Sequence, residues 1–144
     1  MGFLNSYDIT ASALTAERFR VNIISQNLAN QNVTRTANGE PYRRKQVVFQ
    51  ERELAFDKAL SDADAKLKSG GVIVARVVES QADFVPVYDP THPDADEDGY
   101  VLRSNVNRME EQFDLMSASN AYYANLTALE VVKAMTMKTL EIGK

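Results

Sequence analysis

The sequence contains no cysteine and no tryptophan, and His92 is its only histidine among 144 residues. Without cysteine, the chain can form neither a disulfide framework nor a thiolate metal site. A single histidine also excludes any site built on two histidines of one chain. The missing cysteines leave the compartment open, because a cytosolic protein and a protein exported unfolded can both lack them.

Long apolar runs and strong charge are missing as well. No apolar run approaches the ~18 residues of a membrane span, so we expect no membrane insertion. The net charge is only −4, and the one basic cluster, Arg43 to Lys45, is too short for a nucleic-acid footprint. The first ten residues, MGFLNSYDIT, have no basic n-region and no uninterrupted apolar stretch. We therefore expect no cleaved signal peptide.

Motifs of known catalytic chemistry are absent too. The sequence has no G-x-S-x-G elbow, no G-x-G-x-x-G fingerprint and no phosphate-binding G-x-x-x-x-G-K loop. No set of residues supplies a nucleophile, a base and an oxyanion donor together. The sequence predicts a protein that is not an enzyme and has no cofactor. A hydrolase that depends on His92 is kept as an alternative.

One acidic stretch partly matches the pattern of a metal-binding loop. Asp94, Asp96, Asp98 and Gly99 match the first half of a calcium-binding loop. The twelfth position is Asn105, where such a loop needs a bidentate glutamate. We therefore predict a solvated acidic turn and no metal. The alternative is a free-standing helical binding module whose acidic loop takes a cation.

Residues 3–30 are predicted to be a helix that begins with Asn5 or Ser6 as its N-cap. Apolar residues recur every seven positions in two neighbouring rows, which makes a wide apolar face. One row is Tyr7, Leu14, Val21 and Leu28; the other is Ile9, Ala16 and Ile23.

Residues 107–142 are predicted to be a second long helix, in which Asn107 and Glu110 have the spacing of a capping box. It carries three rows: Leu115, Tyr122 and Leu129; Met109, Met116, Tyr123 and Met137; and Ala121, Ala128, Met135 and Ile142. Pairing the two end helices would cover about one row on each. The remaining rows predict further partners.

The middle of the chain has β character. Residues 42–50 and 71–80 are predicted strands, Pro86 limits residues 84–88 to an edge strand, and a short strand follows Gly99. The predicted fold class is α+β, with a coiled-coil-like layer of two terminal helices and a small β-rich insert. The predicted parts are 1–34, 35–106 and 107–144. Within the insert, residues 53–69 are predicted to be either a short helix or a mobile loop.

The stretch SQNLANQNVT places five amide side chains where the first apolar pattern stops. One amide would be enough to satisfy the helix end. The surplus suggests hydrogen bonds between subunits, with Asn27, Asn30 and Asn32 at the junction of helix and insert. The alternative is a polar helix end followed by a solvated loop.

The same stretch resembles the motif A-N-N-L-A-N-x-N-T of the bacterial flagellar axial proteins of rod and hook. Within this family, the resemblance narrows to the proximal rod of the basal body. Three further segments carry it: PYRRKQVVF (41–49), VYDPTHPDADEDGYV (87–101) and SNVNRMEEQFDLMSASNAYYANLTALEVVKAM (104–135).

The resemblance implies a structural subunit that is exported without a cleaved signal and polymerises in the periplasm into a hollow helical tube. The tube would transmit torque and form the export channel. The implied partners are other copies, other rod proteins, the MS ring, the export apparatus and the rod cap. The residues expected at subunit interfaces are Leu14, Val21, Leu28, Asn27, Asn30, Asn32, Leu115, Tyr122, Leu126 and Leu129.

Overall fold

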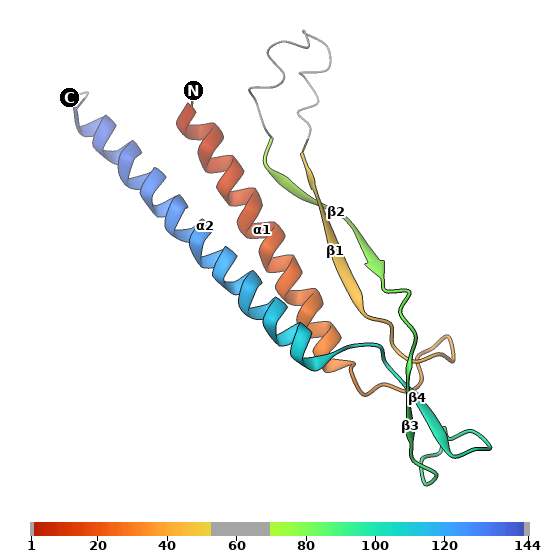
Figure 1. Ribbon diagram of the computed structural model, residues 1–144. Helices are drawn as coiled ribbons and strands as arrows, with labels where there is room; N and C mark the ends of the chain where they lie inside the picture. The colour runs from red at the N-terminus through yellow and green to blue at the C-terminus, as the bar shows by residue number, and fades with distance from the viewer. Residues whose placement is uncertain (1, 53–69, 143–144) are drawn as a thin grey trace, which may run out of the picture. The chain divides into compact units, whose positions relative to one another are not determined.

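The computed structural model describes residues 2–52 and 70–142, and the side chains from residue 5 onward in the first range. In chain order the elements are α1 (Gly2–Ala29), β1 (Lys45–Glu51), β2 (Val72–Glu79), β3 (Val85–Tyr88), β4 (Tyr100–Arg103) and α2 (Arg108–Ile142). The predicted α+β class, with long terminal helices around a small β-rich insert, is confirmed (Figure 1). The segment 53–69, predicted to be a short helix or a mobile loop, lies outside the described residues.

The two helices begin differently from one another. Asn107 caps α2 as predicted: its Oδ1 accepts the Met109 backbone N–H at 3.0 Å, and its Nδ2 donates to Glu110 Oε1 at 3.3 Å. The predicted cap of α1 at Asn5 or Ser6 is wrong, since the helix already begins at Gly2. Neither a proline nor a glycine lies between Gly2 and Asn5, so nothing forces the helix to begin later.

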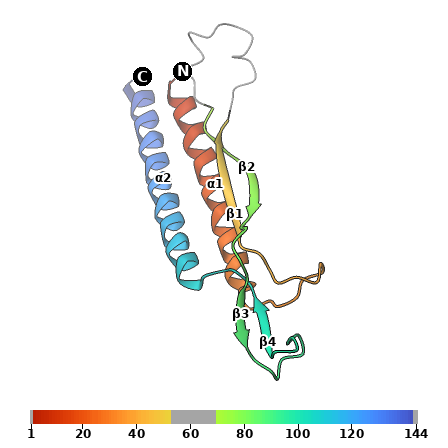
Figure 2. The same ribbon diagram turned by 45° about the vertical axis from the view of Figure 1, so that its right-hand side comes forward.

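The described chain forms two compact units, and each helix contributes to both. In each unit a length of α1 lies beside a length of α2, and the two run in opposite directions (Figures 1 and 2). The buried and half-buried positions on α2 recur at alternating steps of four and three residues, the spacing of a coiled-coil seam. On α2 the buried or half-buried positions of this seam are Glu111, Leu115, Ala118, Tyr122, Asn125, Leu129, Val132 and Thr136.

Unit 1 comprises residues 1–19, 48–76 and 118–144. Its core is thin, and the fully buried seam residues, Ala16 and Ala118, are small. Gly71 approaches α1 so closely that an added Cβ would overlap Ser12 Oγ. Ser12 Oγ in turn accepts the Val72 backbone N–H at 3.0 Å, so only glycine lets β2 begin against the helix.

Unit 2 comprises residues 20–47 and 77–117. Its β3 and β4 form an antiparallel hairpin in which Pro86 faces Leu102 and Tyr88 faces Tyr100. A two-stranded sheet has only edge strands, so Pro86 is tolerated there, as predicted. Gly99, at φ +80°, closes the hairpin in a conformation that favours glycine.

Strands β1 and β2 pair as a second two-stranded sheet. In unit 1 the Arg52 N–H donates to the Gly71 carbonyl, and in unit 2 the Ser80 N–H donates to the Arg44 carbonyl. These pairings make the two strands antiparallel. The predicted boundaries 1–34, 35–106 and 107–144 describe the order of elements along the chain, and they stay a prediction.

Candidate assembly surface

A buried polar junction in unit 2 is centred on Asn27, which is 1% exposed. Its Nδ2 donates to the Lys45 carbonyl oxygen and to Glu111 Oε2, both at 2.8 Å. Its Oδ1 accepts from the Tyr42 hydroxyl and from the Lys45 backbone N–H, both at 3.0 Å. All four hydrogen-bonding positions of the amide are therefore used, by groups from β1, the segment before it and α2.

Arg44 completes the junction by pairing with the acidic side chains in the first turns of α2. Its Nε donates to Glu111 Oε1 at 2.5 Å and its Nη2 to Asp114 Oδ2 at 2.9 Å, while Glu110 lies at 3.9 Å. The Glu111 side chain is 1% exposed, so its charge is retained inside only because Arg44 and Asn27 occupy both oxygens. Arg20 of α1 adds a second cation, 3.6 Å from Asp114.

The junction shifts the pKa of two of its members. Burial raises the pKa of the Tyr42 phenol, and the nearby carboxylates Glu111 and Glu79 raise it further. Burial acts to lower the pKa of Arg44, but its hydrogen bond and charge pairing with Glu111, assisted by Asp114 and Glu110, outweigh burial and raise it. Both shifts favour the protonated forms that the hydrogen bonds require.

The face of α2 opposite the seam is apolar and exposed in both units. In unit 2, Met109, Phe113 and Met116 follow a 4–3 spacing and are 59–65% exposed. In unit 1, Val131, Met135 and Ile142 continue an exposed apolar face and are 51–84% exposed. We call these two groups the exposed stripes of α2. Side chains this large rarely stay in water at such regular spacing unless a partner covers them.

The predicted interface residues fall into two groups. The apolar ones are half-buried on the two helices, and on α2 the seam between the helices includes Leu115, Tyr122 and Leu129. The other half-buried members of this group are Leu14, Val21, Leu28 and Leu126. Each of these side chains keeps some surface for a further partner.

The three asparagines predicted at the interface differ in their burial and in their hydrogen bonds. Asn27 is buried within the chain, whereas Asn30 only donates to the Gln26 carbonyl at 2.8 Å and Asn32 is exposed. The junction of helix and insert is thus centred on Asn27. The role of all three asparagines between subunits stays a prediction.

Sequence reasoning missed Tyr42, Arg44 and Glu111 as parts of this junction. Within the basic cluster Arg43 to Lys45, Arg44 meets acidic partners from residues 110–114. A charged pair three residues apart at the start of α2, Glu111 and Asp114, was the available signal for a cation above that face.

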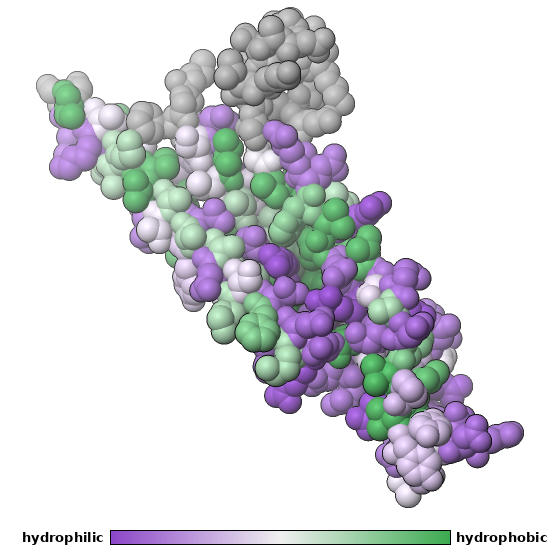
Figure 3. Space-filling model, in the orientation of Figure 1, coloured by the Kyte–Doolittle hydropathy of each residue, from purple (hydrophilic) through white to green (hydrophobic). Residues whose placement is uncertain are grey.

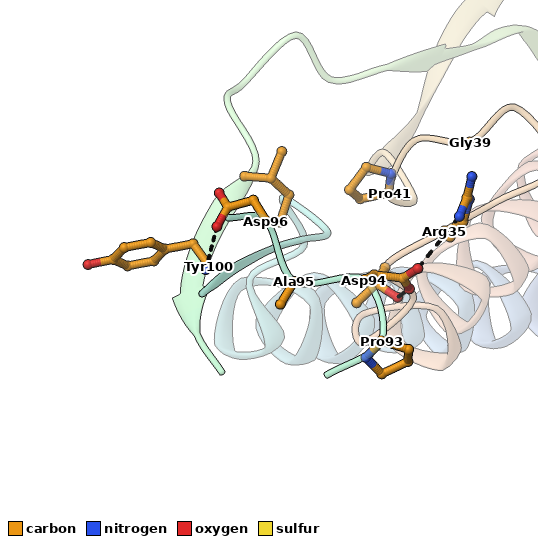
Figure 4. Close-up of a pocket in the computed structure, with 10 residues that line it drawn as sticks. Arg35, Gly39, Pro41, Pro93, Asp94, Ala95, Asp96 and Tyr100 are labelled. Atoms are coloured by element: carbon orange, nitrogen blue, oxygen red, sulfur yellow. Dashed lines mark hydrogen bonds and ion pairs between the residues drawn. The ribbon is translucent and has the colours of Figure 1, made fainter. Parts of the chain in front are cut away.

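Two carboxylates of the acidic loop are held by other groups of the chain (Figure 4). Asp94 accepts the Thr34 hydroxyl at 2.9 Å and lies 3.7 Å from Arg35, while Asp96 accepts the backbone N–H groups of Asp98 and Tyr100. Asp94 and Asp96 therefore turn to different partners instead of converging on one cation. The calcium-binding alternative finds no support in this geometry.

His92 acts within the same loop. Its Nδ1 accepts the Asp94 backbone N–H at 3.1 Å, which is the role of a turn residue. Across the described ranges 2–52 and 70–142, no group of three His, Asp or Glu side chains is placed to hold a metal ion. Of the helices described, neither is both long and apolar enough to cross a membrane.

Comparisons with known proteins give a consistent result. Residues 8–35 match the family model described as flagella basal body rod protein. Over the whole of both chains, the sequence is 44% identical to the flagellar basal-body rod protein FlgC of Bacillus subtilis and 44% identical to that of Salmonella typhimurium. It is also 37% identical, again over both full chains, to FlgC of Buchnera aphidicola.

Proposed function

Because this chain belongs to the FlgC family of flagellar basal-body rod proteins, we propose that it is a structural subunit of the proximal rod and has no catalytic activity. It assembles through its two terminal helices into a helical tube that transmits torque and encloses an export channel. Its partners are further copies of itself, other rod proteins and the rod cap, with the MS ring and export apparatus at its base. Its place is the periplasmic rod.

One observation carries this proposal: α2 buries one seam of 4–3 spacing against α1 and leaves the opposite face apolar. Fully burying a side chain such as Phe113 or Met116 contributes roughly 1.5–3 kcal/mol. Several such side chains along one helix therefore give a contact with neighbouring helices enough free energy to order the subunits. A contact between two different faces does not close on itself, and repetition produces a tube.

Seven half-buried residues contribute both to the packing within their own chain and to the contact with a neighbouring subunit. They are Leu14, Val21, Leu28, Leu115, Tyr122, Leu126 and Leu129. Each packs in or beside the seam of its own chain and presents its remaining surface to a neighbour. Asn27 acts indirectly, since its amide is fully used within the chain and holds α1, β1 and α2 in register. Asn30 and Asn32, less buried, lie where the neighbour would meet this junction.

The test introduces a charged side chain into an exposed stripe of α2. Met116→Asp should leave the free energy of unfolding of the monomer within about 0.5 kcal/mol, because the side chain is exposed there. It should abolish incorporation into basal bodies, because assembly would bury an unpaired carboxylate. Motility of a complemented deletion strain and the composition of purified basal bodies report the result.

Met116→Leu is the matched control, since it keeps an apolar side chain of similar size at the same exposed position. This control should remain motile. A motile Met116→Asp strain whose basal bodies contain the variant at normal levels would overturn the proposal.

A further inference from the structure

Unit 1 contains an apolar groove of about 340 Å³ between α1 and the start of β2. Its apolar walls are Ala16, Phe19, Val72, Ile73 and Val74, and its only charged lining residue is Arg52. Phe19 and Ile73 are exposed within it. Figure 3 shows hydrophobic residues gathered over this part of β1 and β2, with hydrophilic residues around them.

The groove is bordered by positive charge. Arg18 follows Thr15, a lining residue, by one helical turn, and Arg76 follows Val74 on the same strand. Both arginines are exposed. In the part of the chain that the structure describes, neither of them nor Arg52 forms an ion pair with an acidic side chain. The groove therefore suits an apolar surface that carries negative charge.

Unit 2 presents a surface of that kind on its β3–β4 hairpin. The register places Pro86 opposite Leu102 and Tyr88 opposite Tyr100, so these four side chains share one face. All four are exposed, and the two tyrosine rings meet edge to face with their centroids 5.3 Å apart. Tyr88 is 64% exposed, Leu102 50% and Tyr100 45%, so much of this face is open to a partner.

The loop that joins the two strands supplies the negative charge. Residues 89–99 contain five acidic side chains and neither lysine nor arginine. Asp94 is held by Thr34 and Arg35, and Asp96 by backbone N–H groups of the loop. Glu97 and Asp98 are exposed, and their carboxylates form no ion pair within ranges 2–52 and 70–142. The hairpin thus combines an apolar, aromatic face with an acidic tip.

We infer that the groove of one copy receives the β3–β4 hairpin of a second copy. Tyr88 and Leu102 would fill the apolar walls, and Glu97 and Asp98 would meet Arg52 and Arg76. Arginine also stacks favourably on tyrosine rings, so the apolar and charged parts of the contact reinforce each other. Because the two surfaces belong to different units, the contact is heterologous and repeats from copy to copy. This inference rests on the proposed role as a polymerising rod subunit and adds a contact outside the helical layer.

The first experiment is a reciprocal charge reversal in the full-length protein. Arg52→Glu and Asp98→Arg should each lower incorporation into basal bodies about tenfold, since close interfacial charge pairs couple by more than 1.4 kcal/mol. The double variant should recover to within about twofold of wild type. Lys133→Glu, which reverses an exposed charge on α2 away from the groove, is the control and should have no effect.

The second experiment uses the absence of native cysteine. Rods assembled from a mixture of Ile73→Cys and Tyr88→Cys chains should give a disulfide-linked species of two chains on mild oxidation, and rods with either variant alone should not. If rods form normally, the charge reversals are silent and no two-chain species appears, the inference is wrong while the proposed function stands. The proposed function itself fails separately, if Met116→Asp assembles normally.

Discussion

At the scale of single residues, Asn27 is the position whose chemistry is most constrained. Its sequence context showed a surplus of amides, but its partners come from 18 and 84 residues further along the chain. No local pattern reports such distant partners. For this reason the sequence located the junction of helix and insert without revealing Tyr42, Arg44 or Glu111.

Asn27→Ala should destabilise unit 2 by about 3 kcal/mol, because it removes four hydrogen bonds and leaves buried polar groups of Lys45 and Glu111 unpaired. Urea unfolding followed by circular dichroism, with amide exchange to locate the loss, measures this. Asn30→Ala is the comparison, since it removes one bond to the Gln26 carbonyl and should change the free energy by about 0.5 kcal/mol or less. Equal effects of the two substitutions would contradict the assigned role of Asn27.

The raised pKa of Tyr42 predicts an alkaline limit to stability. In the unfolded chain a tyrosine loses its proton near pH 10, and burial holds the proton to higher pH in the folded chain. The stabilisation from this shift is complete below about pH 10 and is lost as the pH rises through the folded pKa. Tyr42→Phe has no such proton and loses only the hydrogen bond to Asn27.

The difference in free energy of unfolding between wild type and Tyr42→Phe should therefore shrink as the pH rises from about 10 through the folded pKa. Urea midpoints of both proteins across this range test it, and Tyr88→Phe, at an exposed position, provides the reference. A difference that stays constant across the range would show that Tyr42 does not titrate with folding.

At the scale of elements, the sequence predicted most of what the structure shows. Helical periodicity and the Asn107 cap define α2, and turn residues such as Gly71 and Gly99 bound the strands. What the sequence left open was which apolar row of α2 faces α1, because three rows are similarly apolar. The choice depends on Glu111, which continues the seam at 4–3 spacing and is held there by partners outside the helix.

The seam itself can be broken by one charge. Leu129→Asp should separate the helices in unit 1, because a carboxylate would replace a half-buried leucine of the seam. Amide exchange should then show lost protection of residues 5–19 and 118–142, with residues 85–103 still protected. Motility should be lost as well.

Leu129→Met, which keeps the side chain apolar and of similar size, should cost less than about 1.5 kcal/mol and remain motile. Val21→Asp on α1 should also abolish motility. A motile strain with either aspartate variant would show that the paired helices are not needed for rod growth.

At the scale of the whole molecule, the predicted order of helix, insert and helix is confirmed. The compact units of the chain, however, do not coincide with these three segments. Contacts group the chain into two units, and each unit draws on both ends and the middle of the sequence. A linear sequence pattern describes elements one after another, so it does not reveal units built from three separate stretches. The predicted apolar rows did include four residues of the exposed stripes, Met109, Met116, Met135 and Ile142. Phe113 and Val131 belong to no predicted row.

The opposite directions of α1 and α2 have a consequence for the timing of folding. A chain that emerges N-terminus first, from a ribosome or from a narrow pore, presents α1 long before Glu111 and the rest of α2 are available. Contacts of such high contact order form late, because loop closure must come first. For a subunit that polymerises as proposed, competence to assemble therefore comes only after nearly its full length has emerged.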